Sequence, residues 1–263
     1  MELKFFKYQG AGNDFIMIDN RSEIFPKKHT NLIAQLCDRR FGIGADGLIL
    51  LENDEISDFK MRYYNSDGNE GSMCGNGARC IVSFANFLNI IGDQAKFSAI
   101  DGMHEGIMEG NLVSIKMKDV DVLEKRGKNI IVLDTGSPHY VCFTNEIENL
   151  DIKKEGSSIR YAPEYSKEGI NVNFVEEKAP GVFSVRTYER GVENETLACG
   201  TGVTAVAIAA NATLRTKKNE ILLKTLGGDL NVTFSKSEKG FENIWLKGPA
   251  EQVFEGKILI DNE

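Results

Sequence analysis

Residues 70–78 (EGSMCGNGA) and residues 195–203 (ETLACGTGV) carry the same pattern, in which a glutamate lies four residues before Cys-Gly-x-Gly. After the first copy, apolar residues recur at helical spacing on one face. After the second copy, Val203–Ala210 is apolar on nearly every side, which is typical of a helix enclosed by other elements. The two stretches therefore predict two central helices, each of which begins at a cysteine, Cys74 or Cys199.

The similarity extends beyond these motifs when the chain is shifted against itself by about 125 residues. In chain order, the matching segments are residues 42–46 (GIGAD) with 169–173 (GINVN), residues 59–65 (FKMRYYN) with 183–189 (FSVRTYE), the two cysteine motifs, and Gly102 with the neighbourhood of Gly228. Four matches in the same order indicate a duplicated half-domain. We expect the boundary in the charged stretch Asp119–Lys128.

Short segments rich in β-branched and aromatic residues predict strands in both halves. These segments are Phe15–Ile18, Leu48–Leu51 and Phe59–Tyr64 in the first half, and Ile131–Leu133, Tyr140–Phe143, Val172–Val175 and Phe183–Tyr188 in the second. A further helix is expected over Asn31–Arg39. The simplest arrangement is a strand-rich half wrapped around its own central helix, twice.

The composition describes an ordinary globular protein of 263 residues, 41% hydrophobic and 27% charged, with a net charge of −8. Lysine and arginine are scattered, which disfavours nucleic acid and membranes as partners. We find no apolar run long enough to span a membrane and no secretory signal at the N-terminus, so a cytoplasmic location is expected. The five cysteines are widely spaced and form no CxxC pair, which predicts reduced thiols and no metal site.

A cysteine at a helix start lies beside unpaired backbone N–H groups and the positive end of the helix dipole, which favour its thiolate. The glycines that follow it allow a small anion such as a carboxylate to approach the backbone. If the two helix starts face each other across an interdomain cleft, one sulfur lies on each side of a bound α-carbon. One thiolate can then remove a proton while the opposite thiol delivers one, which inverts the carbon.

Other interpretations of these residues are weaker. The glycine pairs lack the Lys-Ser or Lys-Thr of a P-loop, and Gly42-x-Gly44-x-x-Gly47 has no strand–loop–helix unit around it. Cys74-x4-Arg79 is one residue short of the phosphate loop of cysteine phosphatases. Inert packing is expected for the remaining cysteines, Cys37, Cys80 and Cys142. His139 is either a core histidine or the partner of a nucleophile.

Taken together, the motifs resemble those of the diaminopimelate epimerase family along the whole chain. The stretches that carry the resemblance are Gly10–Phe15, Gly42–Gly47, Asn65–Gly68, Cys74–Cys80, Gly136–His139, Glu189–Gly191 and Ala198–Gly202. The resemblance implies conversion of LL-2,6-diaminopimelate to the meso form, without pyridoxal phosphate, other cofactors or metal. That reaction belongs to the synthesis of lysine and peptidoglycan precursors.

The same resemblance implies roles for individual residues. Cys74 and Cys199 match the catalytic acid–base pair, and His139 and Glu189 match groups that tune their pKa values. The implied substrate contacts are Asn13, Asn65, Gly75, Asn76, Asn171, Glu189, Arg190, Gly200 and Thr201. Two positions depart from the pattern, because many members have Gln at Gly47 and Asn at Ser137, and we leave both out of the expected site.

By resemblance, the fold is α+β with two pseudo-symmetric halves, each a strand-rich barrel around a central helix. The expected domains are residues 1–118, joined by a returning C-terminal strand at 254–263, and residues 119–253. A homodimer is also implied. Two other functions stay open: a related two-thiol epimerase of a proline-like amino acid, and a catalytically silent binding module. The polar set around Arg190 favours a substrate with a second charged end, and the two matched thiols argue against a silent module.

Overall fold

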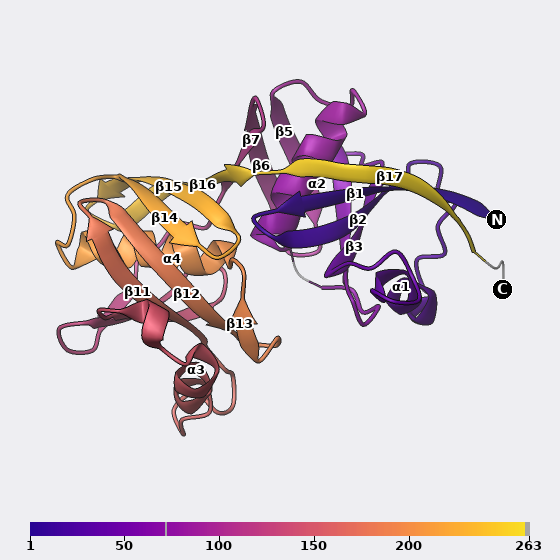
Figure 1. Ribbon diagram of the computed structural model, residues 1–263. Helices are drawn as coiled ribbons and strands as arrows, with labels where there is room; N and C mark the ends of the chain where they lie inside the picture. Colours follow the sequence, from indigo (N-terminus) through magenta and orange to yellow (C-terminus); the bar gives the residue numbers. More distant parts are fainter. Residues whose placement is uncertain (72, 261–263) are drawn as a thin grey trace. The chain divides into compact units, whose positions relative to one another are not determined.

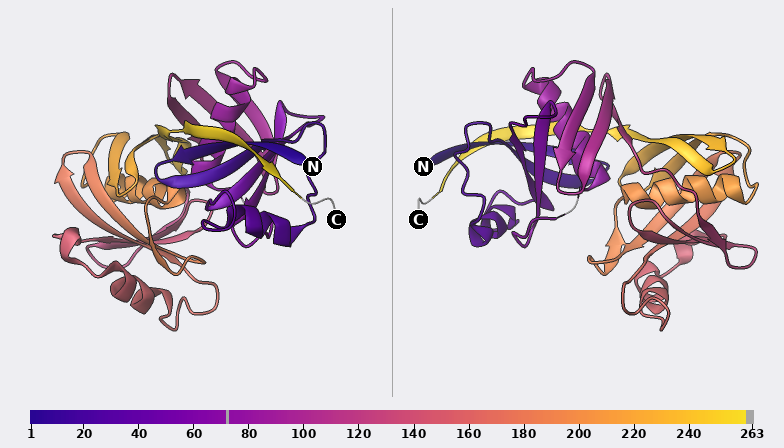
Figure 2. Two further views of the ribbon diagram at one scale, coloured as in Figure 1. Left: turned by 45° about the vertical axis from the view of Figure 1, so that its right-hand side comes forward. Right: turned by 180° about the vertical axis from the view of Figure 1, so that it is seen from behind.

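The computed structural model describes residues 1–71 and 73–260, which form two compact units (Figures 1 and 2). The first unit comprises Met1–Ile115 and the described residues from Gly248 onward, and the second comprises Lys116–Lys247. Residues 261–263, which end the expected returning segment, lie outside the described residues. In the described part of the chain, no helix has the length and apolar character needed to cross a bilayer.

The first unit is a sheet folded around one helix. Its strands are β1 (Glu2–Gly10), β2 (Asn13–Asp19), β3 (Gly47–Glu52), β4 (Phe59–Asn65), β5 (Gln94–Ala99), β6 (Gly102–Glu109), β7 (Leu112–Lys116) and β17 (Glu251–Leu259), and its helices are α1 (Thr30–Cys37) and α2 (Gly75–Phe87). Strand β17 pairs with β1 antiparallel, and Figures 1 and 2 show the two side by side in every view. The strands β2 and β3 pair in parallel, as do β4 and β5.

The second unit repeats this plan. Its strands are β8 (Leu123–Lys125), β9 (Ile130–Asp134), β10 (Pro138–Phe143), β11 (Asn171–Ala179), β12 (Val182–Glu189), β13 (Asn194–Thr196), β14 (Glu220–Thr225), β15 (Gly228–Ser237) and β16 (Gly240–Pro249), and its helices are α3 (Ile152–Arg160), α4 (Gly200–Ala212) and the 3-10 helix η1 (Ile147–Asn149). Here β10 pairs with β11 in parallel and β12 with β14 in parallel. The remaining neighbours in both units pair antiparallel.

The predicted fold class, α+β with two pseudo-symmetric halves, is therefore confirmed. The predicted strands all lie within observed ones, and α2 and α4 are largely buried, as their apolar patterns indicate. The helix expected over Asn31–Arg39 ends early, at Cys37. Its end follows from Asp38, whose carboxylate accepts the backbone N–H groups of Arg40 and Phe41 at 2.7 Å each and closes a turn there.

The strand registers correct one of the sequence matches. Leu48 pairs with Tyr64 and Val172 pairs with Tyr188, and the two tyrosines are equivalent in the repeat. Leu48 therefore corresponds to Val172, so the match of residues 42–46 with 169–173 is out of register by three residues. The match at the other end is right, because Gly102 and Gly228 follow equivalent hairpin turns with φ values of 126° and 132°.

Candidate functional site

The two central helices begin in the same way. Cys74 is the N-cap of α2 and Cys199 the N-cap of α4, both helices have 13 residues, and neither cysteine side chain caps its own helix. The cysteine carbonyls instead accept the first helical N–H groups, from Ala78 at 2.7 Å and from Val203 at 2.9 Å. Each sulfur is thus carried at the positive end of a helix dipole, which favours a thiolate.

In the first unit, two of the expected contact residues bind each other. The Asn76 side-chain amide donates to Asn13 Oδ1, and Asn13 Nδ2 donates to Asp46 Oδ2 at 3.0 Å. Asp46 is itself paired with Arg39 at 2.7 Å, while the oxygen of Asn76 accepts from Arg79 at 2.9 Å. These bonds fix the orientation of both asparagine amides beside the first turn of α2.

Arg79, the fifth residue of α2, is fully buried. Its guanidinium also donates to the carbonyls of Gly75 and Pro249, each at 3.3 Å. Burial lowers the pKa of Arg79, and attraction to Cys80 and Cys74 opposes that change. Because an arginine keeps its proton in proteins, the first turn of α2 contains a buried positive charge. Burial raises the pKa of the Cys80 thiol to about 12, so this cysteine stays protonated, as expected for inert packing.

The two remaining positions of interest in the first unit lie on neighbouring strands. Asn65 ends β4, and a Cβ on Gly71 would meet its amide nitrogen at 2.9 Å. Gly47, where many relatives have Gln, begins β3 and is opposite Asn65 in the register. A Cβ on Gly47 would lie 2.5 Å from the ring of Tyr63, so the space of a longer side chain is taken by this tyrosine.

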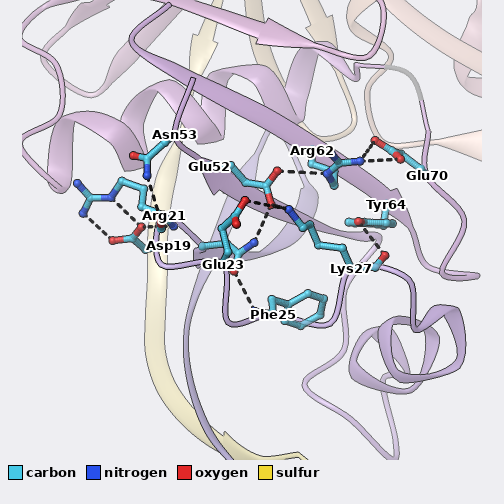
Figure 3. Close-up of polar contacts among 11 residues, drawn as sticks. Asp19, Arg21, Glu23, Phe25, Lys27, Glu52, Asn53, Arg62, Tyr64 and Glu70 are labelled. Carbon is cyan, nitrogen blue, oxygen red and sulfur yellow. Dashed lines mark hydrogen bonds and ion pairs between the residues drawn. The ribbon is translucent and has the colours of Figure 1, made fainter. Parts of the chain in front are cut away.

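An ion-pair network holds the segment that leads to Cys74 (Figure 3). Glu70 accepts from Arg62 of β4 at 2.8 Å and 3.0 Å, and Arg62 also donates to the buried carboxylate of Glu52 at 3.3 Å. Glu52 further accepts from Lys27 at 3.0 Å and from Asn20 at 2.7 Å. The glutamate of the first sequence motif is therefore fixed to the sheet.

The second unit has the equivalent pair. Arg186 of β12 binds Glu195 through two hydrogen bonds, of 2.6 Å and 2.7 Å. The backbone pairing is also repeated, because Glu70 lies opposite Tyr64 and Glu195 lies opposite Tyr188. The glutamates of the two motifs thus have one shared function in the fold, which is to fasten the segment before each cysteine to its sheet.

His139 of β10 is fully buried, and burial lowers its pKa to about 3. It is therefore neutral at physiological pH. One ring nitrogen, Nδ1, lies 3.1 Å from the amide nitrogen of Asn173, and Nε2 lies 3.1 Å from Ser137 Oγ. The expectation that His139 tunes a cysteine pKa stays a prediction, but a neutral histidine can act only through hydrogen bonds.

Ser137 lies at the centre of the second unit's polar residues. Its hydroxyl accepts from the amide of Asn171 at 3.0 Å and lies 3.3 Å from Thr201 Oγ1, which in turn lies 3.5 Å from the sulfur of Cys199. The side-chain oxygen of Asn171 accepts the backbone N–H of Arg190 at 2.9 Å. Ser137, which the sequence analysis left out, therefore connects five expected site residues: His139, Asn171, Arg190, Cys199 and Thr201.

The last two expected side chains lie at the end of β12 and directly after it. Glu189 accepts from the hydroxyl of Thr196 at 2.9 Å. The guanidinium of Arg190 donates to the carbonyl of Glu168 at 2.8 Å. Both side chains are partly buried, so they are held in place and still accessible to a small molecule.

Sequence reasoning missed Ser137, Asn173 and Arg79 as members of the site. Asn173 had a usable signal, because it lies two residues after Asn171 and thus on the same face of a strand. The signal for Arg79 in the sequence was its place in the incomplete cysteine-phosphatase pattern Cys74-x4-Arg79. Among the described residues, no group of three or more His, Cys, Asp or Glu side chains is arranged to hold a metal ion.

The fold places the chain among two-domain proteins of known structure. A phenazine biosynthesis protein of the PhzF family from Bacillus anthracis matches with a TM-score of 0.78 at 13% identity, and covers 99% of this chain and 100% of its own. A hydroxyproline epimerase from Agrobacterium vitis, solved with trans-4-hydroxy-L-proline, matches with a TM-score of 0.68 at 12% identity over 99% and 93%. Because the sequence identities are this low, these structural matches establish the fold alone.

Sequence comparison defines the family. The model of the diaminopimelate epimerase family matches residues 5–120 and 131–253. The diaminopimelate epimerase of Flavobacterium psychrophilum is 57% identical over 97% of this chain and 100% of its own, and that of Chlorobaculum tepidum is 43% identical over 95% and 99%. The chain belongs to the diaminopimelate epimerase family.

Proposed function

We propose that the protein interconverts LL- and meso-2,6-diaminopimelate by moving a proton at one α-carbon between Cys74 and Cys199. The observation that carries this proposal is the equivalence of the two cysteines, each an N-cap of a buried helix of 13 residues. Family membership supports the substrate. The protein is accordingly an isomerase.

The reaction needs one cysteine as thiolate and the other as thiol. The thiolate removes the α-proton from one face, and the thiol on the opposite face donates its own proton to the carbon, so that the two sulfurs exchange protonation states. The backbone N–H groups of Gly75, Asn76, Gly200 and Thr201 are suited to binding the adjacent carboxylate. They stabilise the negative charge that develops when the carbon loses its proton.

The distal end of the substrate carries a second amino group and a second carboxylate. We assign their recognition to the asparagines Asn13, Asn65 and Asn171 together with Glu189 and Arg190. Arg190 uses one nitrogen for the Glu168 carbonyl, which leaves further guanidinium donors for a carboxylate. Glu189 supplies the opposite charge for an ammonium group. Such a site would leave charges unmatched around a substrate without a second charged end.

The setting of the activity is also part of the proposal. We assign the protein to the cytoplasm as a homodimer that acts in the synthesis of lysine and peptidoglycan precursors. A small-molecule substrate is its expected partner, and neither nucleic acid nor a membrane is. The scattered lysines and arginines and the net charge of −8 disfavour nucleic acid and anionic membranes as partners.

The test is proton NMR of LL-diaminopimelate with the reduced protein in deuterated water. Loss of the α-proton signal together with formation of the meso isomer is the expected result. Absence of exchange, with the thiols shown to be reduced, would contradict the substrate assignment. Exchange with proline or hydroxyproline instead would identify the protein as an epimerase of the other substrate class.

A further inference from the structure

The hydroxyl groups between His139 and Cys199 form a connected path within the second unit. From Nε2 of His139 the path runs 3.1 Å to Ser137 Oγ, 3.3 Å to Thr201 Oγ1 and 3.5 Å to the sulfur. Each hydroxyl is able to donate one hydrogen bond and accept two. The orientation of the two hydroxyl protons along this path therefore decides whether the sulfur faces a hydrogen-bond donor or an acceptor.

The direction is set at the histidine end by Asn173. Its side-chain oxygen accepts from Thr187 at 2.9 Å, and its nitrogen donates to the carbonyl of Tyr140 at 3.2 Å. The remaining N–H of this amide faces His139 Nδ1, which must accept it. Since the ring is neutral, its proton is on Nε2 and points to Ser137.

At Ser137 both acceptor positions are filled. One takes the Nε2 proton of His139, and the other takes the amide of Asn171, whose orientation is fixed because its oxygen accepts from the Arg190 backbone. The serine hydroxyl can only donate, and Thr201 Oγ1 is the acceptor within reach. Thr201 Oγ1 lies 3.5 Å from the sulfur of Cys199, so its own proton is then available to that sulfur.

We propose that Ser137 and Thr201 are positioning residues whose hydroxyls form a one-way chain of hydrogen-bond donors that ends on Cys199 and favours its thiolate. A sulfur anion is a stronger acceptor than a thiol, so the chain stabilises the charged form more than the neutral one. The use of this thiolate in proton abstraction rests on the proposed function. The serine that replaces the family's frequent asparagine becomes a connecting element of the site.

Charged groups also lie near the residues of this path. Asp134 ends β9, Glu189 ends β12, and Arg190 follows directly. Asp134 raises the pKa of His139 and Arg190 lowers it, both less strongly than burial does. Glu189 accepts from Thr196, and its negative charge would oppose a thiolate nearby.

The experiment follows the pH dependence of iodoacetamide alkylation of each cysteine by mass spectrometry, in the full chain without substrate. Ser137→Ala and Thr201→Val each remove a link, and we expect the alkylation of Cys199 at pH 7 to fall about 3- to 10-fold with a higher pH midpoint. Thr201→Ser keeps the hydroxyl and is expected to retain the original midpoint. Cys74 in the same samples serves as the internal control.

A double variant, Ser137→Ala with Thr201→Val, tests the connection itself. Once Thr201→Val has removed the contact with the sulfur, the loss of Ser137 adds little, so the double variant is expected to match Thr201→Val. Additive shifts, or an unchanged Cys199 midpoint in folded Ser137→Ala, would overturn the proposal. Because alkylation needs no substrate, this outcome is independent of the NMR test of the proposed function.

Discussion

The first turns of α2 and α4 begin alike and differ in how they surround their cysteines. In α2, a buried arginine, Arg79, lies five residues after Cys74 and binds the turn from within. The equivalent position in α4 is Thr204, whose hydroxyl donates only to the Gly200 carbonyl at 2.9 Å. The second helix start is instead served by the neutral path through Ser137 and Thr201. The two equivalent cysteines thus have different environments. The charge of Arg79 lies near Cys74, and the hydroxyl dipoles of Ser137 and Thr201 lie near Cys199.

The second glycine of each motif shows the same divergence. A Cβ on Gly77 would meet the apolar tip of Ile49 at 3.0 Å, whereas a Cβ on Gly202 would meet Asn173 Oδ1 at 2.5 Å and the Cys199 sulfur at 3.3 Å. We expected these glycines to admit an anion to the backbone. The structure shows that they first allow close packing, against the apolar core in one unit and against the polar path in the other.

Removing either cysteine gives the largest expected effect and tests whether both helix starts take part. Cys74→Ala and Cys199→Ala should each lower the epimerisation rate by roughly 10³-fold, because each loses one acid–base group. Cys142→Ala is the control, since that cysteine is the last but one residue of β10 and begins no helix, and it should retain activity. The rates are measured by the NMR assay, and full activity in either single variant would contradict the two-cysteine mechanism.

The burial of neutral His139 in the second unit predicts that the free energy of unfolding depends on pH. Burial lowers the pKa of His139 to about 3 from 6.5, so between these pH values the unfolded chain binds a proton that the folded chain does not. The contribution of neutral His139 to the free energy of unfolding is therefore fully present above pH 6.5 and is lost as the pH falls. Urea unfolding at pH 7 and pH 5 should show about 2 kcal/mol less stability at the lower pH from this residue.

His139→Gln supplies the control for that measurement. Glutamine does not titrate in this range, so the variant should lose stability between pH 7 and pH 5 by a smaller amount than the parent. Equal losses in both proteins would show that His139 accepts a proton in the folded state, contrary to its complete burial.

The buried charge of Arg79 predicts that its removal changes the reactivity of Cys74. Arg79→Met removes the cation near Cys74, and we expect alkylation of Cys74 at pH 7 to fall on the order of tenfold while that of Cys199 is unchanged. Arg79→Lys should restore part of the rate. Thr204→Val is the matched variant in α4 and should change neither cysteine, so an effect there equal to that of Arg79→Met would remove the distinction between the helices.

The smallest expected effect concerns the paired glutamates. Glu195→Gln should cost about 1 kcal/mol of unfolding free energy, because the neutral amide offers Arg186 one acceptor oxygen in place of two and no opposite charge. Glu70→Gln should cost less, since Arg62 keeps its contact with Glu52. Denaturant unfolding of both variants decides the order, and a larger loss for Glu70→Gln would contradict it.

Much of the fold could be predicted because the chain repeats itself. A duplicated motif identifies equivalent positions without any knowledge of their surroundings, and the apolar periodicity of α4 indicates burial directly. The error arose where similar residues along the chain suggested an equivalence that the strand pairing does not have. The match of residues 42–46 with 169–173 compares similar glycines, yet strand pairing depends on the partner strand, here Tyr64 and Tyr188.

The place of the two cysteines at helix starts was predictable, and the polar connections around them were less so. Cys74 and Cys199 follow from the motif, and their place at helix starts follows from the glycines and apolar runs after them. Ser137 was set aside because it departs from the family pattern. Its importance depends on Asn171, Asn173 and Thr201, which come from other elements and could not be assigned to it by spacing along the chain.

The order of residues along the chain was enough to predict the duplication, the fold class and the matched positions of the two cysteines, because a repeat and a hydrophobic period are both visible in the sequence. Which polar groups meet depends on the folded chain: Arg79 lies against the Gly75 carbonyl, and His139 lies against Ser137. The direction of the path to Cys199 is decided at the same level. A hydrogen bond is defined by distance and by the filling of lone pairs, and those depend on strands and loops that meet only when the chain has folded.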